Sequence, residues 1–439
     1  MGVPAMNVPS LERCVRGHSL IELMVAMVLG LMVAGGFVAV FVATSASYRA
    51  QTQLALLQES GRYAMARLTS DLRTANAFYC GRAGAVPIVQ ASGMMGALHD
   101  LTTRWGHAPY PSSPAAPYRF PPFLSMRGYD CGRTSCVPAA PPDLPAMGRT
   151  AGQRVIGAGM LTLRYLDPDS GWAAGGAAAI AGSVGGAIHH LVIQPAADEP
   201  AIAEVYQPGD LLMLADCPLA QIFSANLQGG DTFYPDAPET GRNLAMPRMP
   251  PSFNAPRLFD FNRDFRTVTY YLQVVDAGDG VTTGALMRRE NGSASEVVRG
   301  VERLDLRYGV EDAAGATRYL AAAQVDDRAG GSIACPQLPS DSVDDDYGCL
   351  WHAVKSIEVH LLVDGQQVHA ASGADATHYA YSIDGDQRPA APEAATRKLR
   401  PAEQGFEPRM LRREFSALVA LRSYRPEAAL ARSPHASIP

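Results

Sequence analysis

The sequence is poor in charged residues and lacks the short motifs of several common enzyme classes. Only 18% of its 439 residues are charged, the formal net charge is −6, and no long run of Lys and Arg occurs. Nucleic acid is therefore not an expected partner, because a surface that binds it needs clustered positive charge. No HExxH, CxxC, GxSxG or GxxxxGK element is present. We therefore predict no catalytic residues, no cofactor and no enzymatic activity.

The rest of the composition is typical of a folded chain with long connections. Hydrophobic residues make up 47% of the sequence, and there are 41 Gly and 33 Pro. This excludes a wholly disordered chain and favours a packed body with irregular loops. The length is enough for one large domain or for two to three smaller ones, so length alone leaves the domain count open.

The longest uncharged run covers residues 23–43 and reads LMVAMVLGLMVAGGFVAVFVA. A helix of this length spans a hydrocarbon core of about 30 Å. Arg13 and Arg16 precede the run, and the next positive charge is Arg49. This bias favours a cytoplasmic start, with the bulk of the chain in the periplasm.

The residues before this run do not read as a secretory signal peptide. The first seventeen, MGVPAMNVPSLERCVRG, are polar and mildly basic and contain no apolar stretch. Gly17 and His18, followed by SLIELMV, closely resemble the prepilin cleavage and methylation motif. The resemblance implies that a prepilin peptidase cuts after Gly17 and methylates the new amino terminus at His18. In that family the position of His18 usually carries phenylalanine.

Glu22 is the acidic residue at the start of the apolar run. A carboxylate at the edge of a long apolar helix is costly unless it is paired or protonated. The resemblance implies an assembly contact, in which Glu22 binds the free amine of a neighbouring subunit's first residue. The alternative is that Glu22 stays hydrated in the lipid headgroup region.

The polar stretch over residues 47–77 continues a helical pattern. Its apolar and small residues recur in steps of three and four, which is typical of an amphipathic helix: Leu54, Leu57, Gly61, Ala64, Leu68, Leu72 and Ala75. Its charged residues fall off this stripe: Glu59, Arg62, Arg67, Asp71 and Arg73. We expect the stripe to lie against the globular body.

The body of the chain reads as loops followed by strands. Residues 78–154 are too rich in Pro and Gly for long helices. Strand-type segments follow at residues 160–166, 191–194, 210–215, 268–275 and 284–289. In SIEVHLLVD, residues 357, 359, 361 and 363 share a face that we expect to be buried, and residues 358, 360 and 362 share one that we expect to be largely hydrated. The predicted fold is α+β, with a long N-terminal helix packed on an antiparallel sheet.

Five segments resemble the PilW family of minor pilins. They are QESGRYAMARLTSDLR at 58–73, DLLMLADCPLAQIFSAN at 210–226, YYLQ with ALMRRE within 270–290, VVRGVERLDLRYGVE at 297–311 and RMLRREFSALVALRS at 409–423. In that family a DGDG-like turn often follows the RYGV element, whereas this chain has EDAAG. The resemblance implies a minor pilin-like protein that acts in pilus assembly or initiation and is located at the pilus tip, with twitching motility and cell adhesion as the associated processes. The sequence leaves open whether the body itself is adhesive or only primes assembly.

These inferences predict a domain organisation and a location. We expect a leader at 1–17, an N-terminal helix at 18–78 with a transmembrane segment at about 20–43, a β-rich body at 79–425 and a flexible tail at 426–439. The chain would sit in the bacterial inner membrane with its body in the periplasm, and at the pilus tip after assembly. Its expected partners are other major and minor pilins through the N-terminal helix, the prepilin peptidase and inner-membrane lipid.

Six of the seven cysteines lie beyond the apolar run, in the part that we place outside the cytoplasm. An even number in an oxidising compartment predicts up to three disulfides, and fifteen connectivities are possible. The preferred set joins nearby cysteines first: Cys131 with Cys136, Cys335 with Cys349, and Cys80 with Cys217. A zinc site is the alternative, but the intervals do not match zinc-type spacing.

No metal site is predicted from the remaining residues. Asp341, Asp344, Asp345 and Asp346 suggest a calcium loop, although a hydrated acidic loop explains them as well. The histidines at 189, 190, 352 and 360 match no ligand or catalytic pattern.

Two other functions share some of these features. A pseudopilin of a type II secretion system has the same N-terminal motif, but the large body and the C-terminal segments favour the pilus. A membrane-anchored periplasmic binding or adhesion module would need convergent site residues, and the sequence spacing indicates none.

Overall fold

The structure is a computed structural model that describes residues 19–80, 85–108, 110–176, 178–183, 185–249, 255–278, 280–312, 315–326, 333, 343, 348–368 and 378–423. The chain falls into two compact units, Met1–Gln53 and Leu54–Pro439. The expected leader at 1–17, His18, the acidic cluster around Asp344, Cys335 and the tail at 426–439 all lie outside the described residues.

One long helix, α1 (Leu20–Leu72), contains the apolar run and the following amphipathic stretch. In the first unit its side chains over residues 20–43 are exposed throughout. In the second unit the stripe Leu57, Ala64, Leu68 and Leu72 is buried, as its spacing predicts. The prediction was wrong for Leu54, whose side chain is 42% exposed, because the core begins one turn later at Leu57.

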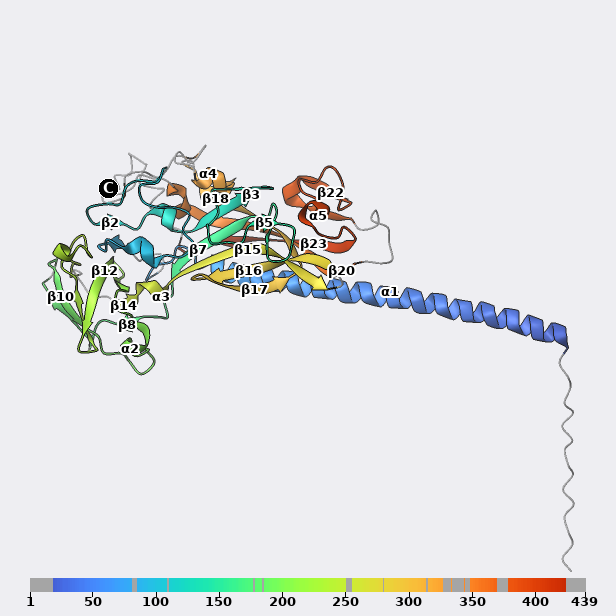
Figure 1. The fold of residues 1–439 in the computed structure, drawn as a ribbon, viewed down its shortest axis with the longest axis horizontal. Helices are drawn as coiled ribbons and strands as arrows, with labels where there is room; N and C mark the ends of the chain where they lie inside the picture. Colours follow the sequence, from blue (N-terminus) through green and yellow to red (C-terminus); the bar gives the residue numbers. More distant parts are fainter. Residues whose placement is uncertain are drawn as a thin grey trace, which may run out of the picture. The chain divides into compact units, whose positions relative to one another are not determined.

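The body contains three sheets and a two-stranded ribbon among the described residues (Figure 1). The central sheet has the order β17-β16-β15-β7-β3-β4, with β6 paired to β15 and β5 to β6. Its strands are β3 (Arg127–Cys131), β4 (Cys136–Val137), β5 (Met147–Gly148), β6 (Arg154–Val155), β7 (Met160–Leu166), β15 (Phe265–Gly278), β16 (Val281–Glu290) and β17 (Ser293–Arg299).

A second sheet has the order β19-β18-β20-β23, and all its pairings are antiparallel. Its strands are β18 (Val301–Glu311), β19 (Thr317–Leu320), β20 (Val354–Val368) and β23 (Met410–Ala420). The ribbon consists of β21 (Tyr379–Tyr381) and β22 (Asp386–Ala390).

The third sheet has the order β8-β14-β11-β12-β13-β10-β9, and β1 joins β12 to β2. Its strands are β1 (Ile88–Val89), β2 (Tyr118–Arg119), β8 (Trp172–Ala173), β9 (Ala179–Gly182), β10 (Ile188–Val192), β11 (Leu211–Asp216), β12 (Leu219–Gln228), β13 (Thr232–Pro235) and β14 (Arg257–Asp260). The pairs β1–β12 and β5–β6 are parallel, and every other described pair is antiparallel.

Short helices connect the strands in the described part of the body. They are η2 (Met94–Ala97), η3 (Pro122–Leu124), α2 (Ile202–Val205), η4 (Pro238–Thr240), α3 (Phe261–Asp264), α4 (Ala322–Asp326), η5 (Cys349–His352), η7 (Ser382–Asp384) and α5 (Pro401–Gln404). The fold is therefore α+β, with α1 as its one long helix among the described residues, as the sequence predicted.

The main core joins the buried stripe of α1 to two of the sheets. Leu57, Ala64 and Leu68 belong to one apolar cluster with residues of β7, β15, β18 and β20. The strands alternate as period-two burial requires, so that Ile357, Val359, Leu361 and Val363 of β20 all enter this cluster. The packed half of α1 is thus part of the core of the body.

The opposite face of β20 contradicts the sequence prediction, because it is not largely hydrated. Leu362 is buried against Tyr379 and Tyr381 of the ribbon. His360 is buried as well, and its Nδ1 lies 2.7 Å from Glu414 Oε1 on β23. That hydrogen bond raises the pKa of His360. A polar residue that alternates with apolar neighbours is expected on an exposed face. Here the ribbon of β21 and β22 forms a second layer that covers this face.

Candidate functional site

The first turn of α1 is closed by a reciprocal pair of hydrogen bonds. The Ser19 backbone N–H donates to Glu22 Oε2 at 3.0 Å, and the Glu22 N–H donates to Ser19 Oγ at 3.3 Å. This is a capping box, which satisfies two N–H groups that a helix start otherwise leaves unpaired. Glu22, singled out for assembly, therefore also caps its own helix. Gly17 and His18, the predicted cleavage and methylation residues, lie outside the described residues.

The helix that begins at this cap is long and apolar enough to cross a membrane. The side chains of its apolar window are fully exposed rather than packed into a core. Such a surface is stable only in lipid or against other apolar helices, because in water it would expose a large apolar area.

The packed half of α1 is pinned by a buried carboxylate. Arg288 Nε on β16 lies 2.7 Å from Asp71 Oδ2, and the Tyr270 hydroxyl on β15 donates to the same oxygen at 2.8 Å. Burial and the nearby Asp71 raise the pKa of Tyr270. Burial alone would lower the pKa of Arg288, but its hydrogen bonds to Glu290 and Asp71 raise it. Asp71 lies off the apolar stripe, as the sequence indicates, and it is nonetheless buried.

A second buried pair closes the C-terminal sheet. Glu302 on β18 and Arg412 on β23 form two hydrogen bonds of 2.6 and 2.7 Å, and both side chains are fully buried. Asp364 lies beside them on β20 and accepts a hydrogen bond from Thr283 at 2.5 Å. Burial, reinforced by the Glu302 charge, raises the pKa of Asp364 to about 8.

These two pairs join segments that resemble the PilW family. Asp71 comes from the segment at 58–73, whereas Tyr270 and Arg288 come from the YYLQ and ALMRRE elements. Glu302 and Arg412 come from the segments at 297–311 and 409–423. Sequence reasoning missed both pairs. Each segment carries several charged residues, so the sequence did not indicate which of them are buried.

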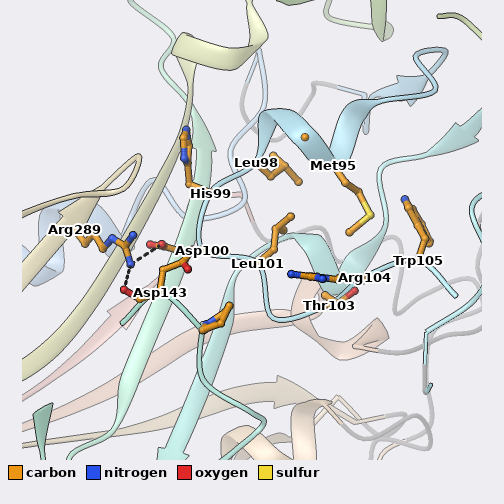
Figure 2. A pocket seen from close by; sticks show the side chains of 12 residues that line it. Met95, Leu98, His99, Asp100, Leu101, Thr103, Arg104, Trp105, Asp143 and Arg289 are labelled. Carbon is orange, nitrogen blue, oxygen red and sulfur yellow. Dashed lines mark hydrogen bonds and ion pairs between the residues drawn. The ribbon is translucent and has the colours of Figure 1, made fainter. Parts of the chain in front are cut away.

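A cavity of about 490 Å³ is lined by Arg289 of β16, by Asp143 and by residues of the segment 95–105 (Figure 2). Arg289 Nη1 lies 3.1 Å from Asp100 Oδ1, and it also donates to the backbone oxygen of Asp143 at 3.1 Å. Consecutive strand residues point to opposite faces, so Arg288 holds α1 while Arg289 holds the loop around Asp100. In Figure 2, Met95, Arg104 and Trp105 lie apart from this ion pair. The carboxylate of Asp100 is thus committed to Arg289.

Disulfides join two of the pairs preferred from the sequence. Cys131 bonds to Cys136 across the β3–β4 hairpin. Cys80 bonds to Cys217, which lies in the turn between β11 and β12. Cys349 is buried and disulfide-bonded, whereas Cys335, its predicted partner, lies outside the described residues. The Cys80 bond ties the chain just after α1 to the third sheet.

The other candidate metal ligands that the structure describes lie on separate elements. No group of three or more His, Cys, Asp or Glu side chains in the described part of the chain is placed to hold a metal ion. His189 and His190 lie on β10, His352 on η5 and His360 on β20. Asp341, Asp344, Asp345 and Asp346 lie outside the described residues.

Comparison with known proteins identifies two regions. Residues 269–423 match the family model for PilW, the Type IV Pilus-assembly protein W. Residues 13–38 match the Prokaryotic N-terminal methylation motif. No curated protein and no solved structure matches the chain. Three of the five PilW-like segments lie inside the first match, which confirms the predicted resemblance. A PilW-like region thus follows an N-terminal methylation motif and its apolar helix, and these matches support a minor pilin-like protein of the type IV pilus.

Proposed function

We propose that the protein acts in pilus assembly or initiation as a minor pilin at the pilus tip. It has no catalytic role. A prepilin peptidase cuts the chain after Gly17 and methylates His18, while α1 holds the precursor in the inner membrane with the body in the periplasm. The observation that carries this proposal is the exposed apolar helix that begins at Leu20, with Glu22 in its first turn, within a methylation motif.

The exposed half of α1 supplies the driving force for assembly. When the subunit leaves the bilayer, its apolar side chains exchange lipid for the helices of neighbouring pilins. Close packing and charge pairing then decide which subunits fit. Glu22 fixes the axial position, since its carboxylate pairs with the amine that cleavage creates on a neighbouring subunit.

The capping box allows a sharp test of this contact. Glu22→Gln keeps a side-chain oxygen that accepts the Ser19 N–H hydrogen bond but removes the negative charge. Losing a charge-assisted hydrogen bond at the interface should lower incorporation into pili about tenfold or more. The amount of the chain that co-purifies with sheared pili measures this. Glu59→Gln, at an exposed position of the same helix, is the matched control.

Processing is measured separately, by mass spectrometry of the mature N-terminus. We expect an N-methylated His18 in the wild type and in Glu22→Gln. Normal incorporation of Glu22→Gln would contradict the assembly role of the charge. An intact leader in the native protein would contradict the processing step. Co-purification with a secretion complex in place of pili would assign the chain to the pseudopilins.

A further inference from the structure

A groove of about 560 Å³ runs over the outer face of the packed half of α1, beside the edge strand β23. Met65, Ala66 and Phe415 form its apolar part, and Arg62, Arg73 and Arg422 supply its charge. We call these six residues the basic groove. Its ten lining residues include three arginines and no acidic residue.

Two contacts hold β23 alongside α1 and so create the basic groove. The Phe415 ring lies over Gly61, where an added Cβ would come within 2.3 Å of the ring. Further along, the Ser423 hydroxyl donates to the backbone oxygen of Ala75. Helix and strand therefore run side by side in the same direction, and the groove lies beside them, lined by residues of both segments.

The strand that borders the groove has an unused edge. β23 is the last strand in the order β19-β18-β20-β23 and pairs only with β20 in the described structure. Its Leu418 side chain is 63% exposed, an unusual state for a leucine in a sheet. Open edges of this kind accept an added strand, whose backbone hydrogen bonds give affinity while side-chain pockets give specificity.

The spacing of the arginines indicates the form of the occupant. Arg62 lies on α1 and Arg73 follows its last residue, Leu72, with its N–H still bonded to the Thr69 oxygen; both arginines are exposed. They are roughly 16 Å apart along the helix axis by the rise per residue. That distance corresponds to about five residues of an extended chain. An extended segment with acidic residues at this interval would place one carboxylate on each guanidinium, and arginine binds carboxylates in a specific geometry.

We propose that the basic groove binds an extended, acidic segment of another pilus subunit, which adds to the edge of β23. This inference rests on the proposed function, because helix packing through α1 brings neighbouring subunits beside this face. It gives the body a contact of its own, distinct from the contact of Glu22. The helices then determine that subunits associate, and the basic groove selects which subunit is the neighbour.

A photo-crosslinker at the bottom of the groove tests the occupant in living cells with the full chain. With p-benzoylphenylalanine at Ala66, we expect a crosslink to a peptide that contains spaced acidic residues, in a protein with its own N-terminal methylation motif. The same probe at Thr240, an exposed position in η4, is the control and should not give this product.

Charge reversal tests the recognition. Arg62→Glu combined with Arg73→Glu should lower the Ala66 crosslink about tenfold, because like charges across an interface are strongly disfavoured. Arg388→Glu, at an exposed position of β22, should leave it unchanged. Replacing the acidic residues of the crosslinked peptide by Lys should restore the contact. Since the two groove positions are exposed, unchanged protease resistance would show that the fold is intact.

Several results would overturn the proposal. These are a crosslink to this chain's own residues, a crosslink to lipid, or a yield that charge reversal does not change. The outcome is separable from that of the proposed function. If Glu22→Gln fails to incorporate while charge reversal has no effect, only the basic-groove proposal fails. If Glu22→Gln incorporates normally, the assembly role of Glu22 fails, whatever happens in the basic groove.

Discussion

At the residue scale, the body depends on buried carboxylates that differ in their partners. Asp71 and Glu302 are each paired with an arginine in the core. Asp364 lies next to Glu302 and accepts a hydrogen bond from the neutral hydroxyl of Thr283. Burial and the nearby Glu302 carboxylate both disfavour the ionised form of Asp364.

This difference predicts a pH dependence of stability. Burial raises the pKa of Asp364 from 3.8 to about 8, so between these values the folded chain holds a proton that the unfolded chain has released. Its contribution to the free energy of unfolding is therefore complete below about pH 4 and is lost as the pH rises through about 8. Asp364→Asn cannot ionise and should flatten this part of the profile.

Urea unfolding of the detergent-solubilised chain between pH 5 and pH 8 measures the effect. Wild type should lose up to about 1.4 kcal/mol per pH unit from this group, and Asp364→Asn should be the more stable of the two at pH 8. Asp169→Asn, at an exposed turn, should keep the wild-type slope. An unchanged slope in Asp364→Asn would contradict the assignment.

At the element scale, the packed half of α1 acts as a core helix with one buried face. Leu68 is 1% exposed and belongs to the main core, whereas Leu56 on the same helix is 48% exposed. The two leucines differ in environment and not in chemistry. They therefore form a matched pair for measuring what the docking of α1 contributes.

Leu68→Ala should lower the free energy of unfolding by about 2–5 kcal/mol, because it removes buried methyl groups and leaves a cavity. Leu56→Ala should change it by less than about 0.5 kcal/mol. Denaturant titration of both variants in detergent provides the comparison. Equal losses would mean that α1 does not dock on the body through the stripe that includes Leu68.

Sequence periodicity predicted the helix and strand segments that bury one face and expose the other. The stripe of α1 from Leu57 to Leu72 and the strand over Met160–Leu166 were found in this way, because their side chains repeat with the period of the element. His360 was misread as solvent-facing and the burial of Asp71 was not predicted, because their partners are distant in sequence. Only the fold brings Arg288 to Asp71, or places the ribbon over His360.

At the scale of the whole molecule, the two described disulfides close loops of very different length. Cys80 and Cys217 are separated by 137 positions, and Cys131 and Cys136 by 5. The longer bond links the segment that follows α1 to the β11–β12 hairpin of the third sheet. The shorter one closes a single hairpin.

Removing the longer bond with Cys80→Ser and Cys217→Ser should cost about 5 kcal/mol by the loop-entropy relation, against about 2 kcal/mol for Cys131→Ser with Cys136→Ser. Thermal unfolding of the two double variants under non-reducing conditions tests this order. A larger loss from the short loop would show that native contacts, and not restriction of the unfolded chain, dominate.

The cap of α1 has a consequence for the timing of assembly. Its hydrogen bonds use groups of residues 19 and 22, whereas the bond proposed for cleavage joins residues 17 and 18. Cleavage at that bond would leave both hydrogen bonds of the cap in place and would add a positive charge. We therefore expect the same first turn in precursor and mature chain, so that the proposed peptidase step would control when a subunit assembles and not how its helix folds.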